Sequence, residues 1–318
     1  IFGCASVVVV AAAVGLASAA DTLAIRTGWG RVWVGTLLLA GATSLPELVT
    51  TSTASWLNAA DLAAANVFGS NMFNIVILTI TIGLFSSASF YNKLSRNQIS
   101  VSLLAIGLTS VATLMGKLKF ETKWAVFSPA ALIIFVMYLA FHLINKKGSD
   151  VPEPQYQTNS WSLKKGWIVF LFSCIGILVA APFMASSADQ IAETTGISES
   201  FIGVLAVAFV SSLPEIVTTV AALRIGAADL AVANIYGTNA FNMLALGIAD
   251  FFYKDASLFG QLDNSALIAG GVAILMMIIG WSQLTWKGST SWKSSTGIRS
   301  FGILVLYGVG LSLVFYTS

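Results

Sequence analysis

Long apolar stretches, separated by short polar segments, dominate the pattern of this chain. Each stretch is close to the length of about 20 mainly apolar residues that a helix needs to cross the hydrocarbon core of a bilayer. Alternation with a period of two is absent, so helices are predicted rather than the strands of a barrel. Ten stretches have this character, at approximately residues 2–20, 32–55, 62–85, 98–116, 124–144, 166–188, 200–223, 230–252, 264–281 and 300–316.

The composition excludes most classes of soluble protein. Of the 318 residues, 57% are hydrophobic and only 9% are charged, whereas a soluble domain is about 25% charged. A soluble enzyme, a nucleic-acid-binding protein and a disordered chain are therefore excluded. The net charge of +2 is too small to indicate a polyanionic partner. The chain is predicted to be an all-α polytopic membrane protein.

The distribution of Lys and Arg predicts the orientation of the chain. If the N-terminus lies outside, twelve of the sixteen Lys and Arg residues fall in connections on the cytoplasmic side, as the positive-inside rule requires. We therefore expect both termini outside and the polar connection 146–165 in the cytoplasm. This connection divides the chain into a first transmembrane repeat (1–147), a short linker (148–163) and a second repeat (164–318).

The two halves are similar in sequence. A shift of 168 residues superposes 32–80 on 200–248 without a gap, and 24 of these 49 positions are identical. Because each half contains five predicted helices, the second half must enter the membrane from the opposite side. Ten transmembrane helices in two inverted five-helix repeats are an architecture of secondary transporters. The alternative is a duplication with a purely structural role.

Two acidic residues, Glu47 and Glu215, are predicted to lie deep within membrane-spanning helices, and they are equivalent in the repeat. A carboxylate in the membrane needs a partner, a proton or water. No Lys or Arg is predicted at a comparable depth, so a bound cation is the natural partner, replaced by a proton when the cation leaves. The alternative is a pair of protonated structural glutamates bonded to neighbouring helices.

The residues before each glutamate support an ion site. Pro46 and Pro214 have no amide N–H and disfavour the preceding helical turn, so each helix should be kinked or broken there. Carbonyls at about 40–43 and 208–211 are then available to an ion. Hard cations such as sodium and calcium prefer oxygen ligands, and the absence of His and Cys argues against zinc or copper. Four hydroxyl side chains flank the two breaks: Thr43, Ser44, Ser211 and Ser212.

The motifs GSNMFN (69–74) and GTNAFN (237–242) supply a facing wall. Their glycines permit helices to approach closely, as small residues do in membranes. In each motif the hydroxyl residue and the last asparagine are four apart and share one helix face. We expect Asn71 and Asn239, which point elsewhere, to cap or cross-link helices.

Together these motifs resemble those of a known family. SLPE occurs in both halves, and each copy is followed about 25 residues later by G[ST]NxFN. This arrangement resembles the two alpha-repeats of the sodium/calcium exchanger (cation/calcium antiporter) superfamily, over essentially the whole transmembrane chain. The short linker resembles the prokaryotic-type branch, which has no large regulatory domain. The resemblance implies a transporter rather than an enzyme, located in a prokaryotic inner membrane or a plasma membrane.

The resemblance implies the ion ligands. Glu47 and Glu215 would coordinate calcium with the carbonyls of Thr43 and Ser211, and sodium sites would share the glutamates. No cofactor is implied: the transported ions and the bilayer are the expected partners, and a monomer without an obligate protein partner is expected. The full set of implied ligands is Ala40, Thr43, Ser44, Glu47, Ser70, Asn74, Ala208, Ser211, Ser212, Glu215, Thr238 and Asn242.

Asn242 departs from part of the family pattern. Several prokaryotic members and the potassium-dependent branch have Asp where this chain has Asn242, and here both halves carry Asn. The site would thus hold two acidic groups rather than three, which argues against potassium coupling.

The resemblance also implies a mechanism. Two carboxylates neutralise one calcium or accept several sodium ions, but not both loads, so alternating access to the site produces exchange. The first and sixth helices are the implied moving part. Two alternatives stay open: a proton-coupled antiporter for calcium or another divalent cation, and a passive cation channel.

Overall fold

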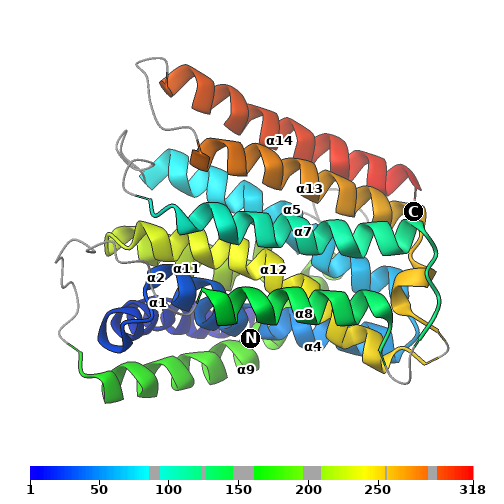
Figure 1. Ribbon diagram of the computed structural model, residues 1–318. Helices are drawn as coiled ribbons and strands as arrows, with labels where there is room; N and C mark the ends of the chain where they lie inside the picture. Colours follow the sequence, from blue (N-terminus) through cyan, green and yellow to red (C-terminus); the bar gives the residue numbers. More distant parts are fainter. Residues whose placement is uncertain are drawn as a thin grey trace.

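The structure is a computed structural model that describes residues 1–85, 94–123, 127–145, 161–195, 209–254, 256–285 and 292–317. These residues fold predominantly into helices whose axes are roughly aligned, as Figure 1 shows. The arrangement confirms the predicted all-α class. The prediction for the seventh stretch falls partly on 200–208, which lie outside the described residues.

Helices occupy each of the predicted stretches as far as the structure describes them. The first half contains α1 (Phe2–Thr27), α2 (Arg31–Val34), the π-helix η1 (Gly35–Leu39), α3 (Ala40–Thr43), α4 (Leu45–Trp56), α5 (Ala60–Phe85), α7 (Asn97–Lys117) and α8 (Pro129–Ile144). The second half contains α9 (Leu163–Thr195), α11 (Leu213–Arg224), α12 (Ala228–Phe252), the 3-10 helix η2 (Leu258–Gln261), α13 (Asn264–Thr285) and α14 (Trp292–Thr317).

The described helices account for fewer membrane crossings than the ten predicted. Within the described ranges, six single helices are long and apolar enough to span a bilayer, and the bent pair formed by 31–43 and 45–56 makes a seventh. Helix α8 is apolar but only 16 residues long. Helix α12 has the length but carries polar side chains, most of which are buried against other helices. Ten crossings therefore remain a prediction.

The second predicted helix is broken where its proline requires it. Helices α3 and α4 meet at Ser44 with a bend of 54°, and Pro46 follows at the second position of α4. Ser212, the equivalent residue before α11, has nearly the same backbone angles (φ −89°, ψ 12°) as Ser44 (φ −90°, ψ 9°). The break is thus repeated in both halves. The π-helix η1 just before it was not expected from the sequence, and such segments are frequent at functional sites.

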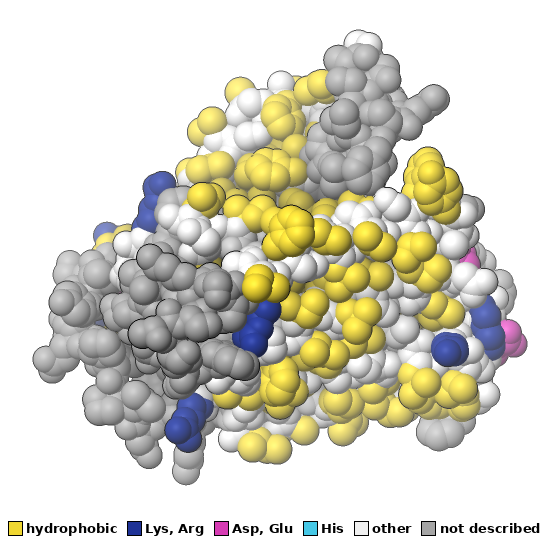
Figure 2. Space-filling model, turned by 90° about the horizontal axis from the view of Figure 1, so that it is seen from above, with side chains coloured by type: hydrophobic (Ala, Val, Ile, Leu, Met, Phe, Trp, Pro, Cys, Tyr) yellow, Lys and Arg dark blue, Asp and Glu magenta, His cyan; other side chains and the backbone are white. Residues whose placement is uncertain are grey.

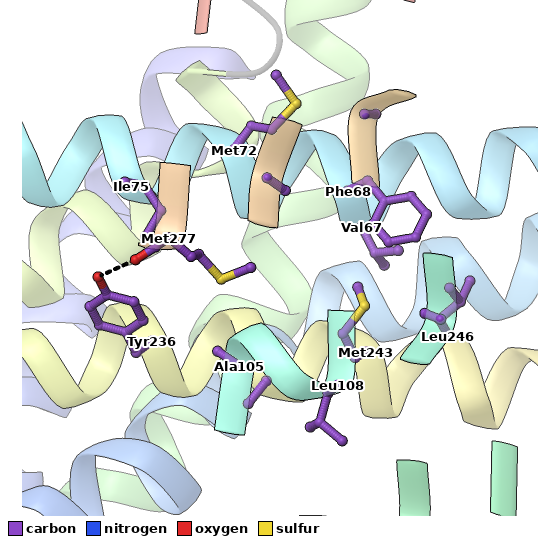
Figure 3. Packing of buried hydrophobic residues seen from close by; sticks show 14 of the residues in the cluster. Val67, Phe68, Met72, Ile75, Ala105, Leu108, Tyr236, Met243, Leu246 and Met277 are labelled. Carbon is purple, nitrogen blue, oxygen red and sulfur yellow. Dashed lines mark hydrogen bonds between the residues drawn. The ribbon is translucent and has the colours of Figure 1, made fainter. Parts of the chain in front are cut away.

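The buried apolar residues form two clusters. The larger joins α5, α7, α8, α12 and α13; Figure 3 shows part of it, where the hydroxyl of Tyr236 donates to the carbonyl of Met277 at 3.4 Å. The smaller joins α1 and α9 to the first turns of α12 and to α11. Helices α1 and α9 pack mainly on each other, along one side of the molecule in Figure 1. They therefore form a unit distinct from the larger cluster.

The outer surface is that of a membrane protein. In Figure 2, hydrophobic side chains cover the middle of the visible face, and Lys and Arg lie toward its two ends. Large apolar side chains such as Phe172, Phe301 and Val136 are more than half exposed. Exposed apolar area of this extent is unusual for a soluble monomer and is satisfied by lipid.

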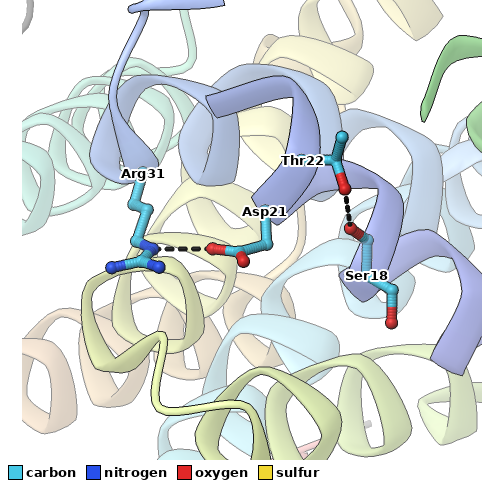
Figure 4. Close-up of polar contacts among 4 residues, drawn as sticks. All are labelled: Ser18, Asp21, Thr22 and Arg31. Atoms are coloured by element: carbon cyan, nitrogen blue, oxygen red, sulfur yellow. Dashed lines mark hydrogen bonds and ion pairs between the residues drawn. The ribbon is translucent and has the colours of Figure 1, made fainter. Parts of the chain in front are cut away.

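A buried ion pair links the first two helical segments. The side chain of Asp21 on α1 accepts from Nε of Arg31 at the start of α2 at 2.7 Å, as Figure 4 shows. The Asp21 side chain is fully buried and that of Arg31 is 9% exposed. Arg31 is one of the twelve Lys and Arg residues that the charge distribution assigns to the cytoplasmic side. The pair could not be inferred because the turn at Gly28–Gly30, both with positive φ, brings the two residues together.

This pair should contribute to stability. Asp21→Ala is expected to lower the free energy of unfolding by about 3 kcal/mol, because it removes the carboxylate beside a buried guanidinium. The measurement is thermal unfolding of the purified protein in detergent. The double variant Asp21→Ala/Arg31→Met should recover part of the loss, and an equally large loss in both would contradict the assignment.

Candidate ion-binding site

The two glutamates occupy equivalent and buried positions. Each is the third residue of the helix that follows the break, Glu47 in α4 and Glu215 in α11. Glu47 is 6% exposed and Glu215 is fully buried. The structure therefore buries both glutamates at equivalent positions of the repeat.

Three of the four carboxyl oxygens of these glutamates are buried without a hydrogen-bond partner in the described structure. Oε2 of Glu47, both carboxyl oxygens of Glu215 and the hydroxyl of Ser44 are buried, and none has a hydrogen-bond partner among the described residues. Nor does any described Lys or Arg form a salt bridge with either glutamate. Buried oxygens in this state are costly unless a cation or a proton satisfies them. No group of three or more Asp, Glu, His or Cys residues that could hold a metal occurs in the described part of the chain.

Asn74 on α5 and Asn242 on α12 add amide oxygens. Nδ2 of Asn74 donates to Oδ1 of Asn239 at 2.9 Å. Nδ2 of Asn242 donates to Oδ1 of Asn71 at 2.9 Å and to the hydroxyl of Ser70 at 3.2 Å. The Oδ1 atoms of Asn74 and Asn242 are buried, and neither has a partner in the described structure. Both amides thus have their N–H groups satisfied by protein and their oxygens available to an ion.

Asn71 and Asn239 cross-link α5 and α12, as predicted. Nδ2 of each residue donates to the backbone carbonyl of the other, both at 3.2 Å. These bonds, and the two to Asn74 and Asn242, follow the same 168-residue shift as the sequence repeat. The repeat is therefore preserved in the hydrogen bonding at the centre of the protein.

Two predicted hydroxyl ligands, one from each half, are enclosed. Thr43 and Thr238 are both fully buried, and their Oγ1 atoms lie 3.5 Å apart. Thr43 Oγ1 also donates to the carbonyl of Ala40 at 3.2 Å, which accepts the amide of Ser44 at 3.0 Å as well. The carbonyl of Ala40 is therefore already bonded, contrary to the expectation that the break frees it. The residue without an N–H is Pro46, and its helical acceptor would be the carbonyl of Ala42.

The other predicted hydroxyl ligands differ in exposure. Ser211 is exposed and Ser70 is half-buried, whereas Ser212 is 3% exposed. The remaining predicted ligand, Ala208, lies outside the described residues. Equivalent residues of the two halves thus differ in exposure, and in opposite senses: Thr43 is more buried than Ser211, whereas Ser70 is less buried than Thr238.

Two aspartates in the first turns of α5 and α12 bind neighbouring helices. Oδ1 of Asp61 accepts the amide of Asp263 at 2.7 Å, and Oδ1 of Asp229 accepts the amide of Ser95 at 2.9 Å. Each carboxylate therefore binds the chain at the beginning of another helix, α13 or α7.

Two further asparagines of α5 and α12 bind the helices that carry the glutamates. Asn66 donates to the hydroxyl of Thr51 on α4, and Asn234 donates to that of Thr218 on α11.

Gly237 allows the close approach of α12 to η1. A Cβ at this position would lie 2.6 Å from Cα of Thr36 and 2.9 Å from its carbonyl oxygen. At Gly69, the equivalent glycine, no described atom lies within 4 Å of such a Cβ. The close approach predicted for both glycines is therefore confirmed at Gly237 but not among the described neighbours of Gly69.

This difference yields a matched pair of variants. Gly237→Ala is expected to cost about 1–3 kcal/mol of stability because backbone atoms must move to accommodate the methyl group. Gly69→Ala should have little effect. Thermal unfolding of both purified variants measures the difference, and equal destabilisation would contradict it.

The comparisons with known proteins agree with this arrangement. A family model described as sodium/calcium exchanger protein matches residues 1–146 and 165–316. The inner membrane protein YrbG of Escherichia coli is 25% identical over 95% of this chain and 92% of its own length. The uncharacterized membrane protein MJ0091 of Methanocaldococcus jannaschii is 30% identical over 65% of each chain, so this chain spans slightly less than two thirds of that relative. Sodium/calcium exchanger MaX1 of Methanosarcina acetivorans is 34% identical over 39% of this chain and 37% of its own.

The fold is also that of solved structures. A structure of the sodium-calcium exchanger NCX_Mj superposes with a TM-score of 0.73 at 19% identity, over 98% of this chain and 96% of its own. At this level of identity the likeness shows the fold alone. The match of the family model, by contrast, extends over both halves of the chain, including both glutamates and both asparagine motifs. The chain therefore belongs to the sodium/calcium exchanger protein family.

Proposed function

We propose that this protein is a secondary antiporter that exchanges sodium for calcium by alternating access to one shared site. The observation that carries the proposal is the pair of buried carboxyl groups, Glu47 and Glu215, whose oxygens lack partners among the described residues. The names of MaX1 and NCX_Mj, both sodium/calcium exchangers, support the choice of ions.

The donor set suits hard cations. Two carboxylates balance the charge of one calcium ion, and the free amide oxygens of Asn74 and Asn242 extend the set with neutral oxygens, as calcium and sodium prefer. We place the carbonyls of Thr43 and Ser211 beside calcium. The remaining proposed sodium ligands are the hydroxyls of Ser44, Ser70, Ser212 and Thr238 and the carbonyls of Ala40 and Ala208. Because the carbonyl of Ala40 accepts two hydrogen bonds here, it would have to release one of them to bind an ion.

Exchange follows from competition for the carboxylates. Calcium and several sodium ions cannot share two negative charges in a dry site, since the excess positive charge would be uncompensated. Each load therefore leaves only when the other replaces it. Helices α1 and α9 are the proposed moving part, because they pack mainly on each other and form a separate apolar cluster with α11 and the start of α12.

The coupling ion is tested by calcium-45 uptake into proteoliposomes. A sodium gradient and a proton gradient are imposed separately, with an ionophore control for membrane potential. Saturable uptake driven by sodium alone supports the proposal. Uptake driven only by protons would assign the site to a proton-coupled antiporter, and flux that needs no counter-ion would assign it to a channel.

The topology is proposed on the charge distribution alone: both termini outside and the linker 148–163 in the cytoplasm, in a protein that acts as a monomer. Reaction of single cysteines introduced in the linker with a membrane-impermeant maleimide, in intact cells and in inverted vesicles, tests the orientation. Labelling of the linker in intact cells would indicate the opposite orientation, with the linker outside.

A further inference from the structure

Asn71 and Asn239 lie outside the proposed ligand set but contact the two asparagines within it. Both are fully buried, and they lie three residues before Asn74 on α5 and Asn242 on α12. Each uses its own N–H to bond the backbone carbonyl of the other. Because the N–H end of each amide is used in this bond, the oxygen end, an acceptor, faces the other neighbour: Asn242 in the case of Asn71, and Asn74 in the case of Asn239.

An acceptor at this point selects the orientation of the next amide. Oδ1 of Asn71 can pair only with the N–H end of Asn242, and Oδ1 of Asn239 only with the N–H end of Asn74; both distances are 2.9 Å. The oxygens of Asn242 and Asn74 are then turned away, and both are buried without a described partner. Since the two ends of an amide have nearly the same shape, packing alone would not distinguish the reverse orientation, which would present N–H groups to a cation.

We propose that Asn71 and Asn239 are positioning residues that hold the amide oxygens of Asn242 and Asn74 toward the transported ion. The inference rests on the function proposed above. The orienting contacts run between the two repeats. Asn71 of the first repeat orients Asn242 of the second, and Asn239 of the second repeat orients Asn74 of the first. The two arms are unequal, because Asn242 has a second acceptor in the hydroxyl of Ser70, whereas Asn239 is the one acceptor of Asn74 in the described structure.

The experiment measures the calcium concentration that gives half-maximal calcium-45 exchange (K½), which does not depend on how much of a variant folds. Asn71→Leu and Asn239→Leu should raise K½ by roughly tenfold, as loss of residues that orient metal ligands does, with the larger effect at Asn239. Asn66→Leu is the control. It removes a half-buried cross-linking amide from α5, away from Asn74 and Asn242, and should leave K½ unchanged.

Double variants separate positioning from general destabilisation. Adding Asn71→Leu to Asn242→Leu should raise K½ no further, whereas adding it to Asn74→Leu should multiply the two effects. Asn239→Leu should show the opposite pattern. Where exchange is too slow, calcium-45 binding to the purified protein replaces it. The inference would be overturned if the effects on K½ were multiplicative in all four double variants, or if K½ rose equally in the control variant Asn66→Leu.

A conservative variant provides a second test if the leucine variants do not fold. Asn71→Asp retains an acceptor for the N–H of Asn242, but it can keep the bond to the carbonyl of Asn239 only while its facing oxygen carries a proton. At acidic pH its K½ should therefore not exceed that of the wild type at the same pH, and a rise like that expected for leucine would overturn the inference. The proposed function is judged separately by the wild type. If the wild type shows no sodium-driven uptake, both proposals fail; if it exchanges normally while the double variants are multiplicative, only the positioning role fails.

Discussion

Replacement of Glu47 or Glu215 by Gln is expected to abolish calcium exchange while the protein still folds and inserts. Each substitution removes one of the two charges that compensate a buried divalent ion. Two unit charges about 4 Å apart attract each other by about 4 kcal/mol at an effective dielectric constant of 20. Loss of one carboxylate charge should therefore lower the affinity for calcium by roughly 100-fold or more. Calcium-45 uptake driven by a sodium gradient measures the loss.

A matched control tests whether the loss is specific to the site. Glu121→Gln makes the same chemical change at an exposed carboxylate, which contacts Gln261, and should exchange calcium normally. Comparable elution profiles of all three variants in size-exclusion chromatography would show that folding is retained. Near-normal exchange by either site variant would exclude that glutamate as an ion ligand.

Asn242→Asp should make transport sensitive to pH. In the wild type, the N–H of Asn242 faces the acceptor oxygen of Asn71 at 2.9 Å. An aspartate has no N–H, so it can keep this contact only while it carries a proton on the facing oxygen. At acidic pH the variant should therefore resemble the wild type. At alkaline pH a third carboxylate joins the site, which a monovalent ion must then balance.

The measurement is calcium-45 flux against sodium concentration over a range of pH, with potassium present or replaced by choline. The wild type should need no potassium, and the variant should acquire a steeper pH dependence or a response to potassium. Asn74→Asp should behave similarly, because its N–H faces Asn239 in the same way. Potassium-stimulated transport in the wild type would contradict the interpretation of Asn242. Identical curves for the wild type and both variants would place these asparagines outside the ion pathway.

Much of the fold could be predicted from the chain because membrane helices leave strong local signals. An apolar stretch of sufficient length must be helical in lipid, since its backbone groups have no water to bond. Pro46 predicted the break at Ser44 by a local mechanism, and the structure confirms it there. The equivalence of Glu47 and Glu215 followed from the repeat, and their burial followed from their position inside long apolar stretches.

Contacts between distant segments could not be predicted in the same way. Whether the carbonyl of Ala40 is free depends on the hydroxyl of Thr43 and the amide of Ser44, not on the proline that follows. The close approach at Gly237 depends on where η1 passes. The pair between Asp21 and Arg31 depends on the turn between α1 and α2.

The sequence by itself determined the class of the protein, its repeat and the chemical identity of its buried acids, because hydropathy, duplication and charge are properties of the chain. Only the tertiary structure decided which polar atoms already have partners. Hydrogen bonds are short and directional, so the state of each oxygen depends on side-chain orientations across α5 and α12, which lie far apart in the sequence. Four asparagines appear alike in the motifs, yet in the fold two of them cross-link helices and two retain a free oxygen.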